Sequence, residues 1–455
     1  MNQNNISAAE LFQRVRELLT LPDLEAKTRN KMMHDTLILC CHEGVKDTKQ
    51  AFGNLFSQVD YLCKARGIKV ADKIAIQTMR RHSNSQEPLS GEDLKYDARA
   101  LTLFISSVFE ERIPHEVNVL IPHINRPFQK GLEINNRRIR CIVKNWDSDF
   151  IRVDIDQDAD EEEYLVRLKD EENHIDHTYL WDLLKEGMQL NLLDCQVKQP
   201  IITPRLIVVE PDYLVDISSI ATCFTAFGHH PLLYLLNLMK PRANTQATLL
   251  GNFAGAALDD IINSHGKYQV NETVKSNFRE KALEFCTCPW FDAKKFYTDA
   301  NLQAFNLQQV VDILFPRTAS QAKMSAFRGE SLYDRKKAIL EPSFVCEALG
   351  IQGRVDLMTT DCKLLVEQKS GRNMNIETHQ VDPAYHSYQL EPHYVQLLLY
   401  YGVLQHNFKL SNDRVNIRLL YSKYQPQDGL MVVAYYQKLF KEAIEYRNQL
   451  VAASF

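Results

Sequence analysis

The chain has 455 residues, of which 45% are hydrophobic and 24% charged, and its formal net charge is −5. This composition is typical of a globular protein of roughly two to four domains, and the net charge excludes a uniformly basic nucleic-acid coat. No apolar run approaches the roughly 18 residues of a membrane helix, and the N-terminus lacks the basic and apolar regions of a secretory signal. With ten cysteines in no framework spacing, we expect reduced thiols, a cytoplasmic location and no membrane partner.

Residues 1–114 are predicted to form a helical region. Ser7 and Glu10 have the spacing of a capping box before an amphipathic run. A second segment with apolar residues at helical spacing extends from Asp35 to Cys63, and a further helix is expected from about Glu92 to Glu111. None of these segments carries a catalytic motif.

Residues 115–213 change to short apolar runs separated by turns, at 117–121, 138–143, 150–154, 190–193 and 206–209. Several short strands of this kind predict a small β-barrel, which we expect to be OB-like. Such barrels bind single-stranded nucleic acid through basic and aromatic side chains. The residues of these types form a candidate single-strand-binding surface: Arg137, Arg138, Arg140, Lys144 and Trp146.

Residues 214–455 are predicted to form one α/β domain, with helices at about 270–286, 303–313 and 431–450, and a strand at 415–421. Near its middle, one apolar run ends at Asp356, a polar turn follows at 359–361, and a second apolar run leads into Glu367 and Lys369. This pattern indicates a hairpin.

The hairpin is predicted to bring two carboxylates and one ammonium group together. Side chains alternate along a strand, so Glu367 and Lys369 share a face that Asp356 on the neighbouring strand reaches. Carboxylate oxygens bind Mg²⁺, which activates water and polarises a phosphate, and a lysine stabilises the developing charge. The alternative is an ordinary hairpin whose acids and lysine form a solvated surface ion pair.

Three flanking features favour the catalytic interpretation. Gly353 and Arg354 precede Asp356, which places a glycine where the backbone passes closely. Arg372 follows Lys369 as part of a basic turn. A strongly helical segment then carries Gln396 and Tyr400 four residues apart, hence on one face of the helix.

These motifs resemble those of the RecB-type branch of the PD-(D/E)XK nuclease superfamily, in which they follow one another in the order Gly-x-x-Asp, Glu-x-Lys and Gln-x-x-x-Tyr. The resemblance implies an α/β (α+β) fold with a restriction-endonuclease-like core. It also implies that Asp356, Glu367 and the main-chain carbonyl of Gln368 hold Mg²⁺ or Mn²⁺, with Lys369 as the catalytic lysine.

The same resemblance implies that Gln396 and Tyr400 order the site and contact DNA, with Arg354 and Arg372 supporting DNA binding. The order of the barrel, Cys223, a helix opening at Gly251 and the hairpin is similar to the nuclease part of DNA-replication nuclease-helicases. It implies a substrate of single-stranded or flap DNA in replication or repair. The chain has no phosphate-cradling Gly-x-x-x-x-Gly-Lys motif, so a helicase motor is expected in the same, longer polypeptide or in a separate subunit.

Two departures from these relatives bear on function. Gly255 stands where these relatives carry a histidine metal ligand. Asp259, one helical turn later, is the residue that we prefer as a substitute ligand. An equal alternative is that Asp259 and Asp260 are simply a pair of solvent-facing acids. Cys223 matches the first ligand of their iron–sulfur cluster, but no cysteine follows Cys362. We therefore expect no cluster and interpret Cys223 as a packed thiol.

The leading hypothesis is a metal-dependent DNA nuclease, and the alternative is a catalytically degenerate DNA-binding or scaffold module of the same fold, for which Gly255 is the main argument. The retention of Asp356, Glu367 and Lys369 argues against degeneration. A third hypothesis, a restriction-type duplex endonuclease, requires a base-reading element that the sequence does not suggest.

Overall fold

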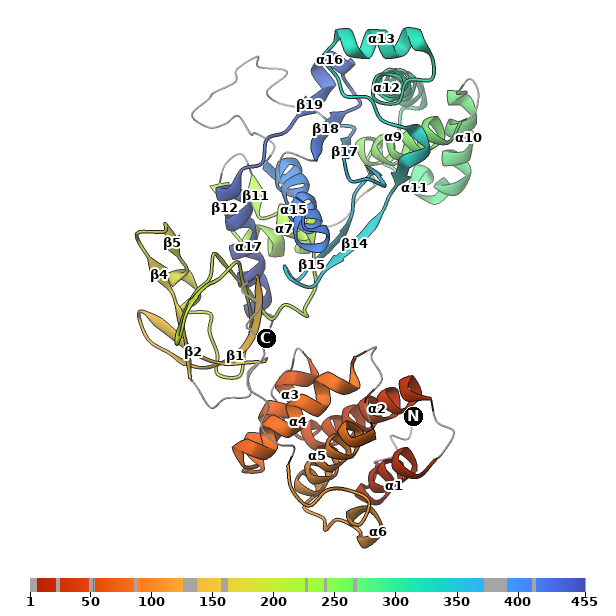
Figure 1. Cartoon of the computed structure of the whole chain (residues 1–455). Coiled ribbons are helices and arrows are strands. Elements are labelled where there is room, and N and C mark those ends of the chain that lie inside the picture. The colour runs from red at the N-terminus through yellow and green to blue at the C-terminus, as the bar shows by residue number, and fades with distance from the viewer. Residues whose placement is uncertain are drawn as a thin grey trace. The chain divides into compact units, whose positions relative to one another are not determined.

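The computed structural model describes residues 6–21, 25–48, 52, 54–85, 89, 91–125, 137–156, 163–225, 228–240, 244–264, 268–371, 391–410 and 415–454 (Figure 1). The fold is mixed α/β, as predicted. The chain divides into two compact units, Met1–Asp212 and Tyr213–Ser454. Among the described residues, no helix combines the length and the apolar character that crossing a membrane requires.

The first unit begins with a helical bundle whose members are α1 Ala8–Thr20, α2 Ala26–Val45, α3 Leu55–Ala65, α4 Val70–Ser83, α5 Gly91–Phe109 and α6 His115–Asn118. The capping box is confirmed, because the Ser7 hydroxyl accepts from the Glu10 amide and the Glu10 carboxylate accepts from the Ser7 amide. The predicted helix from Asp35 to Cys63 is interrupted, since Asn54 caps a new helix there. One apolar core unites the bundle.

The prediction of a strand at 117–121 is wrong, because the helix α6 includes the first residues of this range. Val117 and Ile121 are buried, whereas Val119 between them is 61% exposed. Burial at a spacing of four is helical, and a strand would bury residues two apart. Pro114 is the N-cap of this helix, where its missing N–H removes no intrahelical hydrogen bond.

The second part of this unit is a seven-stranded sheet of order β7-β8-β3-β2-β1-β6-β9. Its strands are β1 Arg138–Trp146, β2 Phe150–Ile155, β3 Tyr164–Arg167, β6 Gln189–Leu193, β7 Gln196–Lys198, β8 Ile201–Thr203 and β9 Leu206–Val209, and a small ladder joins β4 Lys169–Asp170 to β5 Ile175–Asp176. The predicted strands at 138–143, 150–154, 190–193 and 206–209 are thus present.

The predicted barrel closure is not found, since β7 pairs with β8 and β9 pairs with β6, and no described pairing joins these two outer strands. β7 and β8 are only three residues long. Closure of a barrel requires tilted, staggered strands that pair all the way round, and the described pairings of this sheet leave it open.

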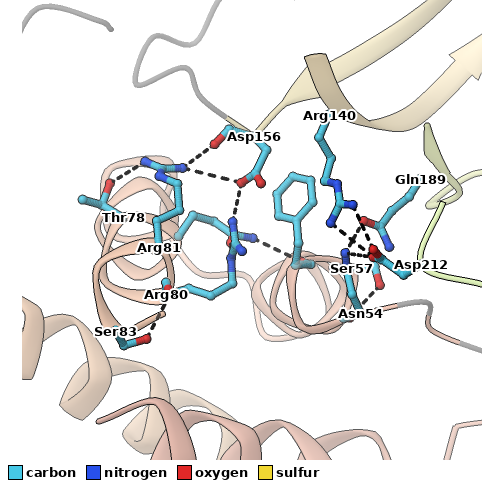
Figure 2. A network of polar contacts seen from close by, with 12 residues as sticks. Asn54, Ser57, Thr78, Arg80, Arg81, Ser83, Arg140, Asp156, Gln189 and Asp212 are labelled. Atoms are coloured by element: carbon cyan, nitrogen blue, oxygen red, sulfur yellow. Dashed lines mark hydrogen bonds and ion pairs between the residues drawn. The ribbon is translucent and has the colours of Figure 1, made fainter. Parts of the chain in front are cut away.

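Polar contacts tie the bundle to this sheet within the first unit (Figure 2). Arg80 of α4 pairs with the Asp156 carboxylate beyond β2, and Arg81 donates to the Asp156 carbonyl at 2.5 Å. At the start of α3, Asn54 bonds the Asp212 carboxylate. Both acids are thus held by partners from the helical bundle.

Two residues of the proposed single-strand-binding surface are engaged in ion pairs of the same unit. Arg140 binds Asp212 through two nitrogens at 2.9 and 3.2 Å (Figure 2). Lys144 lies 2.6 Å from Asp154. These cations already have carboxylate partners in the protein, which weakens the case for a phosphate-binding role.

The second unit contains further helices, namely α7 Ile217–Ala221, α8 Leu232–Met239, α9 Gln246–Asn263, α10 Val270–Glu280, α11 Ala282–Cys286, α12 Ala293–Leu314, α13 Ala319–Phe327, α15 Glu391–Phe408, α16 Pro426–Gly429 and α17 Gln437–Ala452. The helix predicted at 270–286 is divided into α10 and α11. The one predicted from 431 begins at Gln437, because the residues before it form an edge strand.

Its strands are β10 Val215–Asp216, β11 Phe224–Thr225, β12 Gly228–His229, β13 Ala338–Leu340, β14 Ser343–Cys346, β15 Ile351–Arg354, β16 Leu357–Thr359, β17 Leu364–Lys369, β18 Asn416–Tyr421 and β19 Leu430–Val432. The main sheet has the order β13-β16-β17-β18-β19, with β17 and β18 parallel. A second sheet has the order β10-β15-β14. α9 and α12 share one apolar core with β16 and β17, and α15 contacts β17 and β18 (Figure 1).

The predicted hairpin is confirmed as β16 and β17, which pair antiparallel with Leu357 opposite Val366. The apolar run before it is not one strand, however. β15 belongs to the smaller sheet and β16 to the main sheet, and Asp356 lies in the link between them. The chain therefore changes sheets at the residue predicted to be catalytic.

Candidate functional site

Asp356, Glu367 and Lys369 meet beside the end of β17. Because Leu357 lies opposite Val366, the residues next to this pair, Asp356 and Glu367, face each other across the hairpin. Asp356 Oδ2 accepts from the Gln368 amide at 2.5 Å, and Lys369 Nζ donates to Glu367 Oε1 at 2.7 Å. The structure thus brings the three predicted side chains to one point.

Glu367 is buried with half of its carboxylate unsatisfied. Its side chain is 6% exposed, and Oε2 has no hydrogen-bond partner among the described residues. Burial raises the pKa of Glu367, while the neighbouring Lys369 ammonium opposes the rise. Burial also raises the pKa of Asp356. An unpaired buried oxygen is costly, so this carboxylate is suited to receive a proton donor or a cation.

A buried polar network holds the backbone around Lys369. The Gln368 side chain turns away from the acids and donates to Ser422 Oγ at 2.8 Å. Ser422 donates to Gln303 at 2.6 Å, and Asn306 donates to the Ser422 carbonyl at 2.9 Å. Sequence analysis missed Gln303 and Asn306, although two amides three residues apart on the buried face of α12 are a usable signal.

α15 presents one face to this site. Tyr400 is 4% exposed and donates to the Arg354 carbonyl at 2.6 Å. Burial and the charges of Glu367 and Asp356 raise its pKa. Gln396, one turn earlier, is half-buried, and its Oε1 is buried without a hydrogen-bond partner among the described residues. Both predicted supporting residues therefore lie on the helix that packs on β17 and β18.

His393, which sequence analysis did not identify, occupies the same helix face three residues before Gln396. Its Nδ1 lies 3.0 Å from the Tyr421 hydroxyl. Burial and the nearby charge of Lys369 lower its pKa to about 4, so the ring is neutral at neutral pH. The helical spacing of His393 and Gln396 was the signal that could have identified it.

Glycine at position 353 permits the close approach of Tyr400, and this gives a testable pair of variants. In Gly353→Ala the new Cβ would lie 2.9 Å from Tyr400 Cε1 and 3.2 Å from Ile217 Cδ1. We expect the free energy of unfolding to fall by about 1–3 kcal/mol through overpacking. A Cβ at Gly255 in α9 would meet no atom within 4 Å, so Gly255→Ala should instead stabilise by about 0.5–1 kcal/mol.

Urea unfolding followed by circular dichroism measures both variants. Equal effects of the two substitutions would contradict the packing of Tyr400 against Gly353.

α9 places one of its two adjacent acids beside the site. Asp259 is half-buried, and burial, followed by the charges of Glu341 and Asp356, raises its pKa to about 6. Asp260 is exposed and accepts a hydrogen bond from Thr273. The two acids thus have different surroundings, and the one preferred from helical spacing is the one whose pKa responds to the charge of Asp356.

A further acid, Glu341, comes from the turn between β13 and β14 and was missed by sequence analysis. Its amide donates to the Asp356 carbonyl at 2.9 Å, and its carboxylate lies 3.1 Å from Arg354 Nη1. No motif marks this residue, because only the pairing of β13 with β16 brings it to Asp356. Arg372, the other predicted basic residue, lies outside the described residues.

The donor chemistry of the site suits a hard divalent cation such as Mg²⁺ or Mn²⁺, since the available groups are carboxylates and one has an unpaired oxygen. Within the described ranges, however, no group of three or more His, Cys, Asp or Glu side chains is arranged to hold a metal ion directly.

Cys223 is buried, and burial raises the pKa of its thiol to about 12. Its Sγ lies 3.9 Å from the Pro231 carbonyl. A buried, protonated thiol of this kind behaves as a small apolar side chain.

No model of a known protein family matches this chain, and no curated protein matches its sequence. The resemblance to RecB-type nucleases therefore rests on the order and spacing of a few residues: Asp356, Glu367, Lys369, Gln396 and Tyr400.

Proposed function

We propose that the second unit is a metal-dependent deoxyribonuclease that hydrolyses phosphodiester bonds in single-stranded or flap DNA, on a PD-(D/E)XK core. The observation that carries the proposal is the convergence of Asp356, Glu367 and Lys369, with the buried Oε2 of Glu367 unpaired. Burial raises the pKa of both acids beside the lysine, and perturbed pKa values of this kind cluster at functional sites, which supports the proposal.

Each residue has a distinct role in this proposal. Asp356, Glu367 and the Gln368 carbonyl would hold Mg²⁺ or Mn²⁺, which when bound polarises the phosphate and lowers the pKa of a bound water. Lys369 opposes the rise in the pKa of Glu367 that burial causes, through their 2.7 Å contact, and would stabilise charge on the phosphate oxygens. Tyr400 fixes the Arg354 backbone, and Arg354 is exposed enough to contact a DNA phosphate.

The cellular setting is proposed from the resemblance alone. DNA replication or repair is the process, and a helicase in the same longer polypeptide or in a separate subunit is the partner. The helicase motor is proposed to lie outside these 455 residues because their sequence has no phosphate-cradling motif for ATP.

The proposal is tested by incubating the protein with end-labelled single-stranded, flap and duplex DNA in Mg²⁺, Mn²⁺ or EDTA. We expect metal-dependent cutting of single-stranded or flap DNA, lost in Glu367→Gln because a neutral amide binds the cation poorly. Asp361→Asn removes an acid at the turn of the same hairpin, where Asp361 pairs with Lys337, and should leave cutting unchanged.

The other outcomes identify the competing functions. Cutting of duplex DNA alone would indicate a restriction-type endonuclease. DNA binding without cutting in any metal would indicate the degenerate binding or scaffold module, which Gly255 in place of a histidine favours.

A further inference from the structure

At its β3-β8-β7 end, the seven-stranded sheet of the first unit has one face in the core and one face outside it. Val166, Ile202 and Val197 are level with one another on these three strands, and all three pack in the apolar core of the sheet. Because side chains alternate along a strand, the residues on either side of this row point to the outer face. The polar residues among them are Arg167 of β3, Thr203 of β8, and Gln196 and Lys198 of β7.

A cavity of about 350 Å³ lies on this outer face. The sheet contributes the four polar residues just named and Ile201 to its lining, and the β4–β5 ladder with its turn contributes residues 169–173. The volume falls at the lower end of the range found for small-molecule sites. The cavity can therefore hold a molecule that is larger than a single inorganic ion.

Arg167 is held in a fixed position at this cavity with one donor unused. Phe150 lies directly opposite Arg167 in the pairing of β2 with β3, and the guanidinium carbon stands 5.6 Å from the centre of the phenyl ring. The Nε of Arg167 is buried, and it has no hydrogen-bond partner among the described residues. A buried donor without a partner is costly, and stacking on an aromatic ring orients a guanidinium, so the side chain is suited to receive an anion.

Most of the charges on the β4–β5 side of the cavity are already matched within the hairpin. Lys169 donates to Glu171 at 2.9 Å, and the Asn173 side chain donates to the Asp170 carboxylate at 2.9 Å. The remaining acid, Glu172, is exposed, where water and salt screen its charge.

The sheet side carries the two cations that are left for a ligand. Neither Arg167 nor Lys198 forms an ion pair with another described residue, and they approach the cavity from two different strands. A phosphate group accepts hydrogen bonds from both types of side chain, and the planar guanidinium can bind two of its oxygens at once. The acids of the hairpin would repel a long polyanionic strand, which favours a ligand with few negative charges.

We propose that this cavity binds the phosphate group of a small molecule the size of a nucleoside monophosphate. Arg167 and Lys198 hold the phosphate, and Gln196 and Thr203 offer hydrogen bonds to the rest of the ligand. The site lies in the first unit, and the inference does not rest on the proposed nuclease function.

The test is calorimetric titration of the full chain with AMP and with inorganic phosphate, in EDTA so that no metal ion in the second unit can bind either probe. We expect AMP to bind more tightly than inorganic phosphate, because it fills more of the cavity. Arg167→Gln should weaken AMP binding by about tenfold or more, the loss expected for hydrogen bonds to a charged group, and Lys198→Gln should weaken it several-fold. Arg112→Gln is the matched control, since it removes an exposed arginine of the same unit that does not line the cavity, and it should bind AMP as the wild type does.

Three results would overturn the inference. The first is wild-type protein that binds neither probe at millimolar concentration, and the second is unchanged AMP affinity in both Arg167→Gln and Lys198→Gln. The third is Arg167-dependent binding of a short oligothymidylate that is tighter than the binding of AMP, which would identify a strand-binding surface instead. Thermal unfolding of each variant checks that a loss of binding does not come from a loss of the fold. DNA cleavage by the same samples tests the proposed nuclease separately, so either proposal can fail without the other.

Discussion

Replacing Lys369 by methionine is expected to reduce DNA cleavage by about a hundred- to a thousandfold, the loss found when one stabilising donor is removed from an active site. Methionine preserves the length and apolar stem of lysine but removes the ammonium group that lies 2.7 Å from Glu367 Oε1. Initial rates on end-labelled single-stranded DNA in Mg²⁺ measure the effect.

The same variant should change the pH dependence of cleavage in a definite direction. Burial raises the pKa of Glu367, and Lys369 lowers it. Removing the lysine therefore raises this pKa further, so that more Glu367 is protonated and unable to bind a cation at neutral pH. Residual cleavage by Lys369→Met should increase more steeply than wild-type cleavage between roughly pH 7 and pH 9.

Lys369→Arg is the matched control, since it keeps the positive charge beside Glu367 and should retain the wild-type pH profile even if its rate falls. Wild-type rates in Lys369→Met would refute the assignment of the catalytic site. A reduced rate with an unchanged pH profile would show that Lys369 acts on the phosphate only, without controlling the ionisation of Glu367.

Replacing Arg447 by methionine should lower the free energy of unfolding by about 3 kcal/mol, because buried acceptors that lose their donor are left unsatisfied. Arg447 in α17 is fully buried. It donates to the Gly350 carbonyl at 3.1 Å and to the Tyr213 carbonyl at 2.6 Å. These carbonyls precede β15 and β10, whose parallel pairing begins the smaller sheet.

Thermal unfolding should show this loss as a decrease in Tm of roughly 6–12 °C. Lys438→Met is the control, because it removes the same charge from an exposed position of the same helix and should unfold as the wild type does. If Arg447→Met also unfolds at the wild-type temperature, the buried guanidinium does not hold these strand ends.

Since Gly353 and Arg354 lie on β15, we also expect slower cleavage by Arg447→Met.

Local pattern was enough to predict the hairpin. The polar turn between two apolar runs indicated antiparallel strands, and the alternation of side chains placed Glu367 and Lys369 together. Both features depend on residues close in sequence, and the observed register agrees with them. The capping box at Ser7 was predictable for the same reason.

Prediction failed where a sequence pattern is compatible with two different structures. The apolar run at 117–121 suits a strand as well as a helix, and the packing of Val117 and Ile121 decided for α6. Short strands also predicted a closed barrel, but closure depends on whether the two outer strands meet, and local sequence does not determine this.

Only the tertiary structure brought Glu341 and His393 to the candidate site. Their positions depend on β13 pairing with β16 and on α15 packing against the main sheet. Helical spacing made Asp259 the preferred substitute for the missing histidine, with a solvent-facing pair as the equal alternative. In the structure Asp259 is half-buried and the charge of Asp356 acts on its pKa, whereas Asp260 is exposed and bonds Thr273. The sequence by itself therefore determined the hairpin with Glu367 and Lys369 on one face, because that arrangement needs only local alternation. The tertiary structure decided which distant acids and which histidine surround it, because contacts between remote segments depend on the packing of the whole unit.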